Sequence, residues 1–248
     1  MLTLISSRAF AGNYLWLMHD GKQALVVNPG DPAPVSRYLQ EHALQLKLIL
    51  VTHHHAGHKA GVDELREATG AKVYGPAAEH IQQPYVPLRE GDSVTAAGLD
   101  FQVLEVPGHT LGQIAFYTPA MNNHPLLFCG DTLFSRGCGR LFECTPAQML
   151  ASLAKLATLP GNTRVCCTHE YTLSNLRFAL AEYHRQCIRL REHDQPTLPR
   201  STAHVLLINP LLHTRQATVK TAALHFDAAA HNDTSVFAAI RQWKNQFK

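Results

Sequence analysis

Four histidines lie within six consecutive residues, in the segment 52–58 (THHHAGH), directly after an apolar run that ends at Val51. His53 and His55 are two positions apart, so both imidazoles project to the same side of an extended backbone and can reach one ion. His58 lies three residues further on, past the bend, and faces a neighbouring point. Because imidazole is a common protein ligand of transition metals, this spacing indicates metal binding.

Three further potential ligands follow other apolar runs in the same way. Each comes within three residues of the end of a short apolar segment, which places it where the loops of a sheet protein hold ligands above the strand ends. Imidazole together with carboxylate suits Zn²⁺, Fe²⁺ or Mn²⁺ rather than Ca²⁺. We therefore predict one metal centre built from His53, His55, His58, His109, Asp131 and His169.

The elements that must position these groups are short and separated by turn residues. Residues 14–18 and 24–27 are rich in β-formers and flank Asp20-Gly21, which predicts a hairpin. Residues 47–51 are too apolar for a solvent-facing side, so we expect a central strand covered on both faces. The other predicted elements are helices at 33–41, 62–68 and 146–157 and strands at 71–74, 101–106, 114–117, 126–129 and 164–167.

From about Thr172 the pattern becomes helical, with stretches at 174–190 and 235–247. Strands before this point and helices after it predict an α+β protein. We place a catalytic domain at residues 1–171 and a smaller helical domain at 172–248.

Composition narrows the class of protein. Of the 248 residues, 46% are hydrophobic, which is the usual share for a globular protein and excludes wholesale disorder. The formal charge is only +3 and Lys and Arg are scattered, which argues against nucleic-acid binding. No apolar run reaches the ~18 residues of a membrane span, and the N-terminal residues lack a secretory pattern. We therefore expect a cytoplasmic monomer whose six cysteines are reduced.

The histidine motif, with the later His109, Asp131 and His169, resembles the metallo-β-lactamase superfamily. The chain is more similar still to its hydroxyacylglutathione hydrolases (glyoxalase II), and the resemblance covers nearly the whole length. The segments that carry it are 107–112 (PGHTLG), 128–134 (FCGDTLF), 137–143 (GCGRLFE), 169–172 (HEYT), 191–195 (REHDQ) and 209–212 (NPLL).

The resemblance implies a four-layer αββα sandwich with a C-terminal helical domain, and a two-metal hydrolase. One ion would be held by three imidazoles and the other by two, with Asp131 bridging. The expected ion is Zn²⁺, with Fe or Mn as alternatives. Asp131 and His58 are the expected catalytic residues. The implied ligand sets are His53, His55 and His109 for the first ion and His58 and His169 for the second.

The implied reaction is hydrolysis of S-D-lactoylglutathione by metal-bound hydroxide, which yields glutathione and D-lactate. A thiolate leaves readily, with a free thiol pKa of only ~8.5, so no strong general acid is required. Glu170 is a further candidate to orient the hydroxide. By the same resemblance, glutathione would be bound by Arg140, Phe142, Tyr171, Asn175, Arg191 and His193. Phe142 replaces a tyrosine of some relatives, and His193 replaces a common lysine.

Two departures from the family pattern affect the metal centre. The family has an aspartate directly before the last histidine of the motif, and here that position is Gly57. The family also usually has aspartate where this chain has Asn28. The second ion therefore lacks its own carboxylate ligand, and we predict that it binds more weakly by at least about 10- to 100-fold.

Two other functions fit the same residues. A mononuclear iron enzyme of this fold, resembling persulfide dioxygenases, would use two histidines and one aspartate and would tolerate an impaired second site. A non-catalytic binder of glutathione conjugates could remain after loss of the second ion. Oxygen uptake with a glutathione persulfide would favour the first alternative, and the effect of Gly57→Asp on hydrolysis separates the second from the hydrolase.

Overall fold

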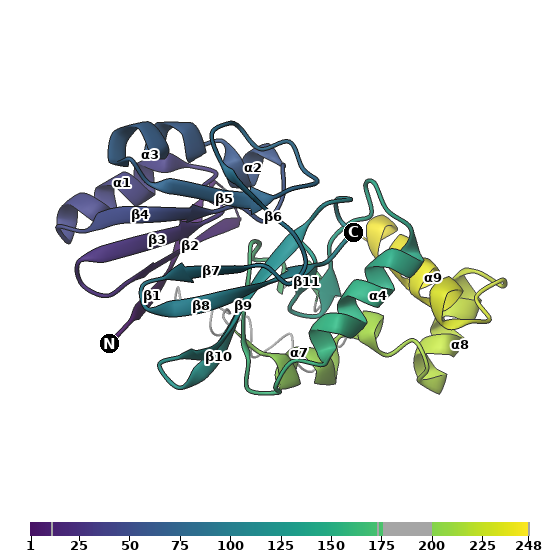
Figure 1. The fold of residues 1–248 in the computed structure, drawn as a ribbon. Coiled ribbons are helices and arrows are strands. Elements are labelled where there is room, and N and C mark those ends of the chain that lie inside the picture. The colour runs from purple at the N-terminus through teal and green to yellow at the C-terminus, as the bar shows by residue number, and fades with distance from the viewer. Residues whose placement is uncertain (11, 173, 176–199, 248) are drawn as a thin grey trace.

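The computed structural model describes residues 1–10, 12–172, 174–175 and 200–247. Two six-stranded sheets are stacked on one another, with helices on their outer faces (Figure 1). This is the four-layer α+β arrangement predicted from the sequence, and the C-terminal part adds the expected helices. Among the described residues, no helix combines the length and the apolar character that crossing a membrane would need.

In the first sheet, the first three strands pair antiparallel and the strands from the third onward pair parallel. Its helices α1 (Pro32–Glu41) and α3 (Val62–Thr69) cover one face, and Asp31 caps α1 by accepting from the Ala33 N–H at 3.0 Å. In order, its strands are β1 (Thr3–Ala9), β2 (Asn13–His19), β3 (Gln23–Val27), β4 (Gln45–Leu50), β5 (Lys72–Pro76) and β6 (Val86–Leu88).

The second sheet packs its inner face against the first and places α4 (Pro146–Ala157) on the other side. Thr145 and Gln148 form the capping box that begins α4. A two-stranded hairpin, β11 (Leu133–Phe134) and β12 (Gly137–Cys138), follows β10. In order, the strands of the second sheet are β14 (Arg200–Ser201), β13 (Arg164–Cys167), β10 (His124–Gly130), β9 (Ile114–Met121), β8 (Leu99–Glu105) and β7 (Ser93–Ala96).

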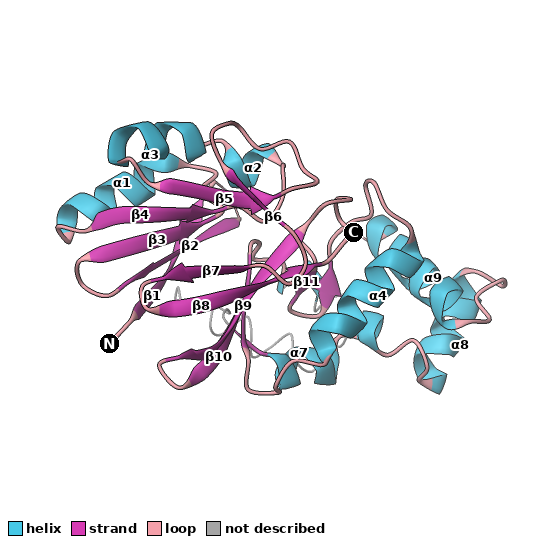
Figure 2. Cartoon of the chain, in the orientation of Figure 1, coloured by secondary structure: helices cyan, strands magenta, loops and turns pink. Residues whose placement is uncertain are grey.

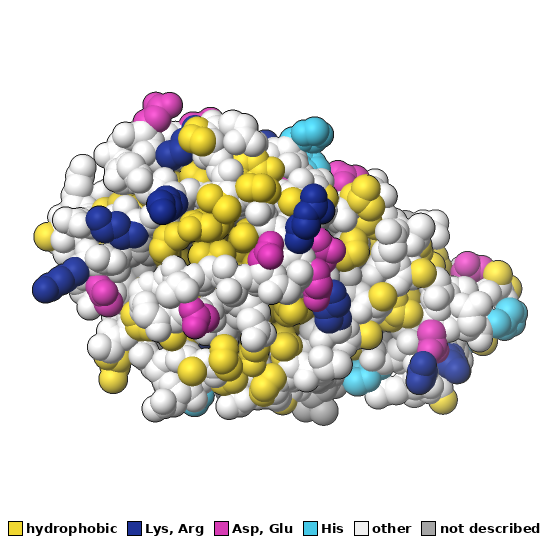
Figure 3. All heavy atoms as spheres, viewed as in Figure 1, with side chains coloured by type: hydrophobic (Ala, Val, Ile, Leu, Met, Phe, Trp, Pro, Cys, Tyr) yellow, Lys and Arg dark blue, Asp and Glu magenta, His cyan; other side chains and the backbone are white. Residues whose placement is uncertain are grey.

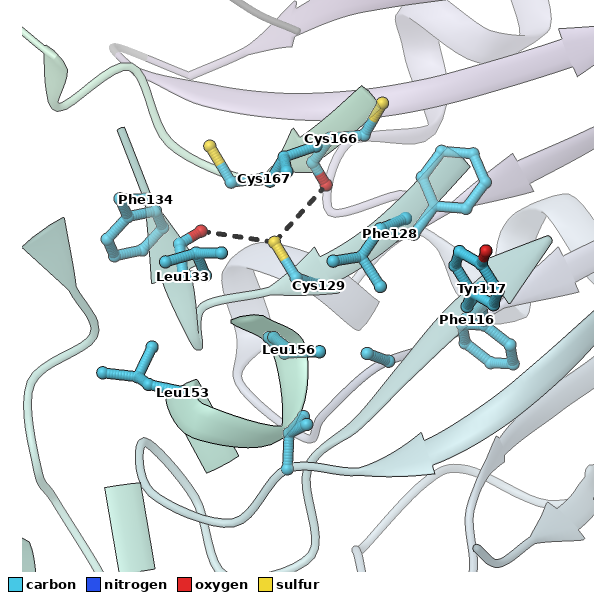
Figure 4. Close-up of a cluster of buried hydrophobic side chains, with 14 of the residues drawn as sticks. Phe116, Tyr117, Phe128, Cys129, Leu133, Phe134, Leu153, Leu156, Cys166 and Cys167 are labelled. Carbon is cyan, nitrogen blue, oxygen red and sulfur yellow. Dashed lines mark hydrogen bonds between the residues drawn. The ribbon is translucent and has the colours of Figure 1, made fainter. Parts of the chain in front are cut away.

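The core around β10 shows why this platform is rigid. Figure 4 shows Phe128 and Cys129 of β10 beside Cys166 and Cys167 of β13, with Leu156 of α4 beneath. The Cys129 thiol donates to the Leu133 carbonyl at 3.2 Å and is fully buried, which raises its pKa far above the ordinary value. It is therefore a packing group rather than a nucleophile.

The C-terminal helices lie at the end of the molecule away from α1 and α3 (Figure 2). They are α7 (Thr202–Ile208), the 3₁₀ turn η1 (Pro210–Leu212), α8 (Ala217–Phe226) and α9 (Asp233–Gln246). Helix α9 packs against α4 and runs back toward the sheets, so its last residues lie near the ends of the strands (Figure 1). The helix predicted at 174–190 lies, apart from Ser174 and Asn175, outside the described residues.

Candidate metal centre

Four strands deliver the six predicted ligands to one edge of the stacked sheets. β4, β8, β10 and β13 each end a few residues before a ligand. Backbone hydrogen bonds join the sheets there: the Ile114 N–H donates to the Thr52 carbonyl at 3.0 Å, and the Tyr14 N–H donates to the Thr168 carbonyl at 2.7 Å. These bonds hold the two sheets in a fixed relative position where the ligand-bearing loops begin.

The first ligand group brings together donor atoms of His53, His55, His109 and Asp131, all within 4.8 Å of one another. His109 Nε2 lies 3.0 Å from His55 Nδ1 and 3.2 Å from Asp131 Oδ2. Burial lowers the pKa of His53 well below its ordinary value and also lowers the pKa of His55, where His109 adds to the effect. Both rings are therefore neutral at physiological pH, which is the form that binds metal.

The second ligand group consists of His58, Asp131 and His169, also within 4.8 Å. His58 is buried in the short helix α2 (Ala56–Lys59), and the ring of His169 stacks on Tyr171 with centroids 4.6 Å apart. Asp131 belongs to both groups, with Oδ2 at 3.1 Å from His169 Nε2 and Oδ1 at 3.5 Å from His58 Nε2. One carboxylate thus faces both sites.

The electrostatics of Asp131 suit a shared ligand. Burial by itself would raise the pKa of this carboxyl, but His58, His109 and His169 together hold it well below its usual range. Thr168 also donates its hydroxyl to Asp131 Oδ1. The side chain is 6% exposed and ionised, so it presents a full negative charge to both groups of imidazoles.

Hydrogen bonds fix which ring nitrogens face the centre. His109 Nδ1 lies 2.9 Å from the Arg140 carbonyl oxygen. Because that oxygen can only accept a hydrogen bond, Nδ1 carries the proton and Nε2 is the nitrogen left to coordinate an ion. Thr52 Oγ1 lies 3.0 Å from His53 Nδ1, and Asn28 Nδ2 donates to the same oxygen at 3.0 Å. Asn28 therefore acts on His53 through Thr52.

The donor set fits a divalent transition-metal ion. Within the described part of the chain, the buried His53 Nε2 has no hydrogen-bond partner. An unsatisfied buried nitrogen costs free energy, and a metal ion bound among His53, His55, His109 and Asp131 removes that cost. The second ligand group has three potential metal ligands, one fewer than the first.

Gly57 comes directly before His58 and has no side chain that could add a ligand. It lies in α2 at the cavity wall and contributes only backbone, and its carbonyl accepts from Asn13 Nδ2 at 3.2 Å. A side chain there would point toward Asn13, because an ideal Cβ on Gly57 would lie 2.9 Å from Asn13 Nδ2. In the described residues the second group therefore has two imidazoles and a shared carboxylate.

A cavity of about 540 Å³ opens in front of both groups. Four of the predicted substrate residues line it: Arg140, Phe142, Tyr171 and Asn175. The Phe142 ring stands edge-on to His55 and His109, with centroids 5.5 and 5.2 Å away. Asn175 is buried and donates to the Ser135 carbonyl at 3.0 Å. Arg191 and His193 lie outside the described residues.

Sequence reasoning missed the contribution of α9. Its last turns bring Arg241 and Lys244 to the same cavity, three residues apart and therefore on one face of the helix. Arg140 lines the same cavity. Burial lowers the pKa of Lys244, and the positive charges of Arg241 and Arg140 lower it further. Arg241 is buried and donates to the Cys138 carbonyl at 3.0 Å, which fixes this end of α9 against β12.

Glu170 is held away from the centre. Its Oε2 accepts from the Tyr14 hydroxyl at 2.6 Å, and it is missing from the described residues that line the cavity. Of the two carboxylates expected from the sequence to orient hydroxide, only Asp131 is among the described residues that line the cavity. On the face shown in Figure 3, basic and acidic side chains are interspersed.

Comparisons with known proteins agree with this geometry. The model of the metallo-beta-lactamase superfamily matches residues 9–169, and that of the hydroxyacylglutathione hydrolase C-terminus matches residues 170–247. The hydroxyacylglutathione hydrolase of Albidiferax ferrireducens is 55% identical over 99% of this chain and 100% of its own. That of Pseudomonas aeruginosa is 50% identical over the full length of both. Among solved structures, ETHE1 from Myxococcus xanthus aligns with TM-score 0.69 and 26% identity over 99% of this chain and 100% of that one.

Proposed function

The chain belongs to the metallo-β-lactamase superfamily and, within it, to the hydroxyacylglutathione hydrolases, and from that premise we propose that it hydrolyses the thioester of S-D-lactoylglutathione to glutathione and D-lactate. One observation carries the proposal: a metal-ligand cluster and a cluster of three cations share one cavity. The metal-ligand cluster suits attack on a carbonyl. The cluster of cations suits binding of glutathione, which is a thiol that carries two carboxylates.

Each group of residues has a distinct task in this reaction. We assign the two carboxylates of glutathione to Arg140 and Lys244, since a cationic cluster attracts anions and a guanidinium fork grips a carboxylate. Arg241 adds positive charge beside them, while its own guanidinium donates to the Cys138 carbonyl and to Asn245 Oδ1. Phe142 and Tyr171 are 61% and 44% exposed and offer apolar surface at the cavity mouth. With glutathione bound in this way, the acyl group would lie in the part of the cavity that Asp131, His58 and His109 line.

Hydrolysis adds the oxygen of water to the acyl carbon and breaks the C–S bond. When bound, divalent metal ions lower the pKa of a coordinated water toward ~7 and polarise the thioester carbonyl. The ionised Asp131 is placed to accept a hydrogen bond from the attacking oxygen and so to orient it. The thiolate departs without a strong general acid because its pKa is only ~8.5.

We propose Zn²⁺ as the resident ion, because the nitrogen atoms of imidazole and the oxygen atoms of carboxylate are ligands that suit it. Fe and Mn remain the alternatives that the same donors would accept. His53, His55, His109 and Asp131 would hold the tighter ion, and His58, His169 and Asp131 the weaker one. The monomeric state and the cytoplasmic location stay predictions.

The two alternative functions are less well supported. The curated relatives that match over the whole chain are named as hydrolases, which favours thioester cleavage over persulfide oxidation. A pure binder would have no use for a converging set of imidazoles around a buried carboxylate. Thioester cleavage without oxygen uptake, or oxygen uptake with a glutathione persulfide, separates the hydrolase from the dioxygenase.

Removal of metal tests the proposed function. The purified chain is expected to release glutathione from S-D-lactoylglutathione, and dialysis against a chelator is expected to lower the rate by about 10²-fold or more, since a metal ion contributes several kcal/mol to catalysis. Added Zn²⁺ should restore the rate. The released thiol is measured with a chromogenic disulfide. A chain that binds metal but releases no thiol would contradict the proposal.

Replacement of Lys244 by alanine tests the substrate side. We expect KM to rise about tenfold with kcat nearly unchanged, because a hydrogen bond to a charged group contributes ~1.5 kcal/mol or more. Lys22, an exposed residue of the β2–β3 turn, provides the matched control in Lys22→Ala, which should alter neither constant. A fall in kcat at unchanged KM would argue against this assignment.

A further inference from the structure

Glu79 is a buried carboxylate that the reaction above does not use. It follows β5, and its side chain is only 1% exposed. Oε1 accepts from the Thr110 hydroxyl at 2.6 Å and from the Gly112 N–H at 3.0 Å. Oε2 accepts from the His54 N–H at 2.9 Å and contacts His54 Nδ1. Four donors therefore converge on one carboxylate.

These donors come from the two loops that carry the imidazoles of the first ligand group. His54 lies between His53 and His55, while Thr110 directly follows His109. The hydrogen bond to the His54 N–H fixes the backbone from which both flanking rings project. The bonds to Thr110 and Gly112 fix the loop that carries the third ring.

The local sequence allows this close approach. An ideal Cβ on Gly112 would lie 2.7 Å from the Ala78 carbonyl oxygen and 2.8 Å from Glu79 Cγ, so a side chain there would push the two loops apart. On the solvent side, His54 Nε2 is 3.3 Å from Glu143 Oε1, and Glu143 Oε2 accepts from the Leu111 N–H at 2.8 Å. Glu143 thus repeats the link between the same loops, but at an exposed site.

We propose that Glu79 is a positioning residue for the first metal site: it joins the loop of His53 and His55 to the loop of His109 and so sets the spacing of their donor atoms. The inference rests on the proposed metal-dependent function. A buried carboxylate is suited to this task because each oxygen accepts two bonds, one set from each loop. An amide cannot replace it, since its NH₂ group would face donors on one of the loops.

Metal affinity tests this role without substrate. Zn²⁺ is titrated into the metal-depleted chain in competition with a chromophoric chelator, and Co²⁺ absorption spectra report the ligand geometry. We expect Glu79→Gln to weaken the tighter ion about 10- to 100-fold and to alter the Co²⁺ spectrum, as is typical for groups that orient metal ligands. Glu79→Asp should recover part of the affinity. With saturating metal, kcat should stay reduced while KM for the thioester is unchanged.

A matched control separates positioning from general stability. Leu39 is buried in α1, on the far side of the first sheet, and Leu39→Ala should lower the melting temperature without changing Zn²⁺ affinity or the Co²⁺ spectrum. Should Glu79→Gln fail to fold, Thr110→Val removes a single donor and is expected to weaken Zn²⁺ binding to a smaller degree. Unchanged Zn²⁺ affinity and Co²⁺ spectrum in the folded variants would overturn the proposal. A wild-type chain that binds Zn²⁺ but hydrolyses no thioester would instead refute the proposed function alone.

Discussion

Asp131→Asn is expected to lower kcat for thioester hydrolysis by about 10³-fold and to release metal from both sites. Asp131 is the carboxylate that both ligand groups share, with oxygens within 3.5 Å of His58, His109 and His169. An amide is neutral and presents one oxygen, so neither ion keeps its anionic ligand. The magnitude follows because metal ions contribute several kcal/mol to such reactions and ~1.4 kcal/mol corresponds to a factor of ten.

The measurement combines kinetics with metal analysis. Metal per chain is determined after gel filtration, and kcat is measured with and without added Zn²⁺. Asp100→Asn is the matched control: Asp100 is exposed and accepts from the Thr95 hydroxyl at 2.6 Å. It lies at the start of β8, whereas the ligand His109 follows the other end of that strand. Asp100→Asn should leave metal content and kcat unchanged. Full metal content and near-normal kcat in Asp131→Asn would contradict the assigned role of the shared carboxylate.

The metal ligands could be predicted because their signal is local. Each follows a short apolar run, and a buried strand of this kind can be identified from composition alone. The predicted strands at 47–51, 126–129 and 164–167 correspond to β4, β10 and β13, and the predicted helices at 33–41 and 146–157 correspond to α1 and α4. The edge strand β1, with mixed polar and apolar residues, carries no such signal and was missed.

The residues around the ligands were missed because their partners are distant in sequence. Arg241 reaches β12 across 103 positions, and Glu79 contacts Thr110 across 31. Neither spacing follows from the periodicity of a helix or a strand. From the sequence alone, Arg241 would be interpreted as a charged residue of the C-terminal helix and Glu79 as an exposed acidic residue. Their burial and hydrogen-bond partners appear only once the chain is folded. From the sequence, the basic residues expected to bind glutathione were Arg140, Arg191 and His193. Of these, only Arg140 belongs to the described residues.

The second prediction with a large effect concerns Gly57. We expect Gly57→Asp to tighten binding of the second ion by at least about 10- to 100-fold and to raise kcat at low metal concentration by a similar factor. The backbone there is held close to Gly30, whose own Cβ would lie 1.8 Å from the Gly57 carbonyl oxygen, so the new side chain has a defined direction. It would enter beside Asn13 Nδ2, which is the end of a side chain and can shift.

Two control variants isolate the carboxylate from the change in shape. Gly57→Ala introduces the same Cβ against Asn13 without a ligand atom, and Gly57→Asn introduces a similar volume without charge. If the second site lacks an anionic ligand, only aspartate should raise the metal content toward two ions per chain, because a neutral amide oxygen is a weaker ligand for these metals than carboxylate. Elemental analysis and kcat are measured for all three. An equal response of alanine and aspartate would show that Gly57 limits activity through backbone freedom, and the account of the weak second ion would then be wrong.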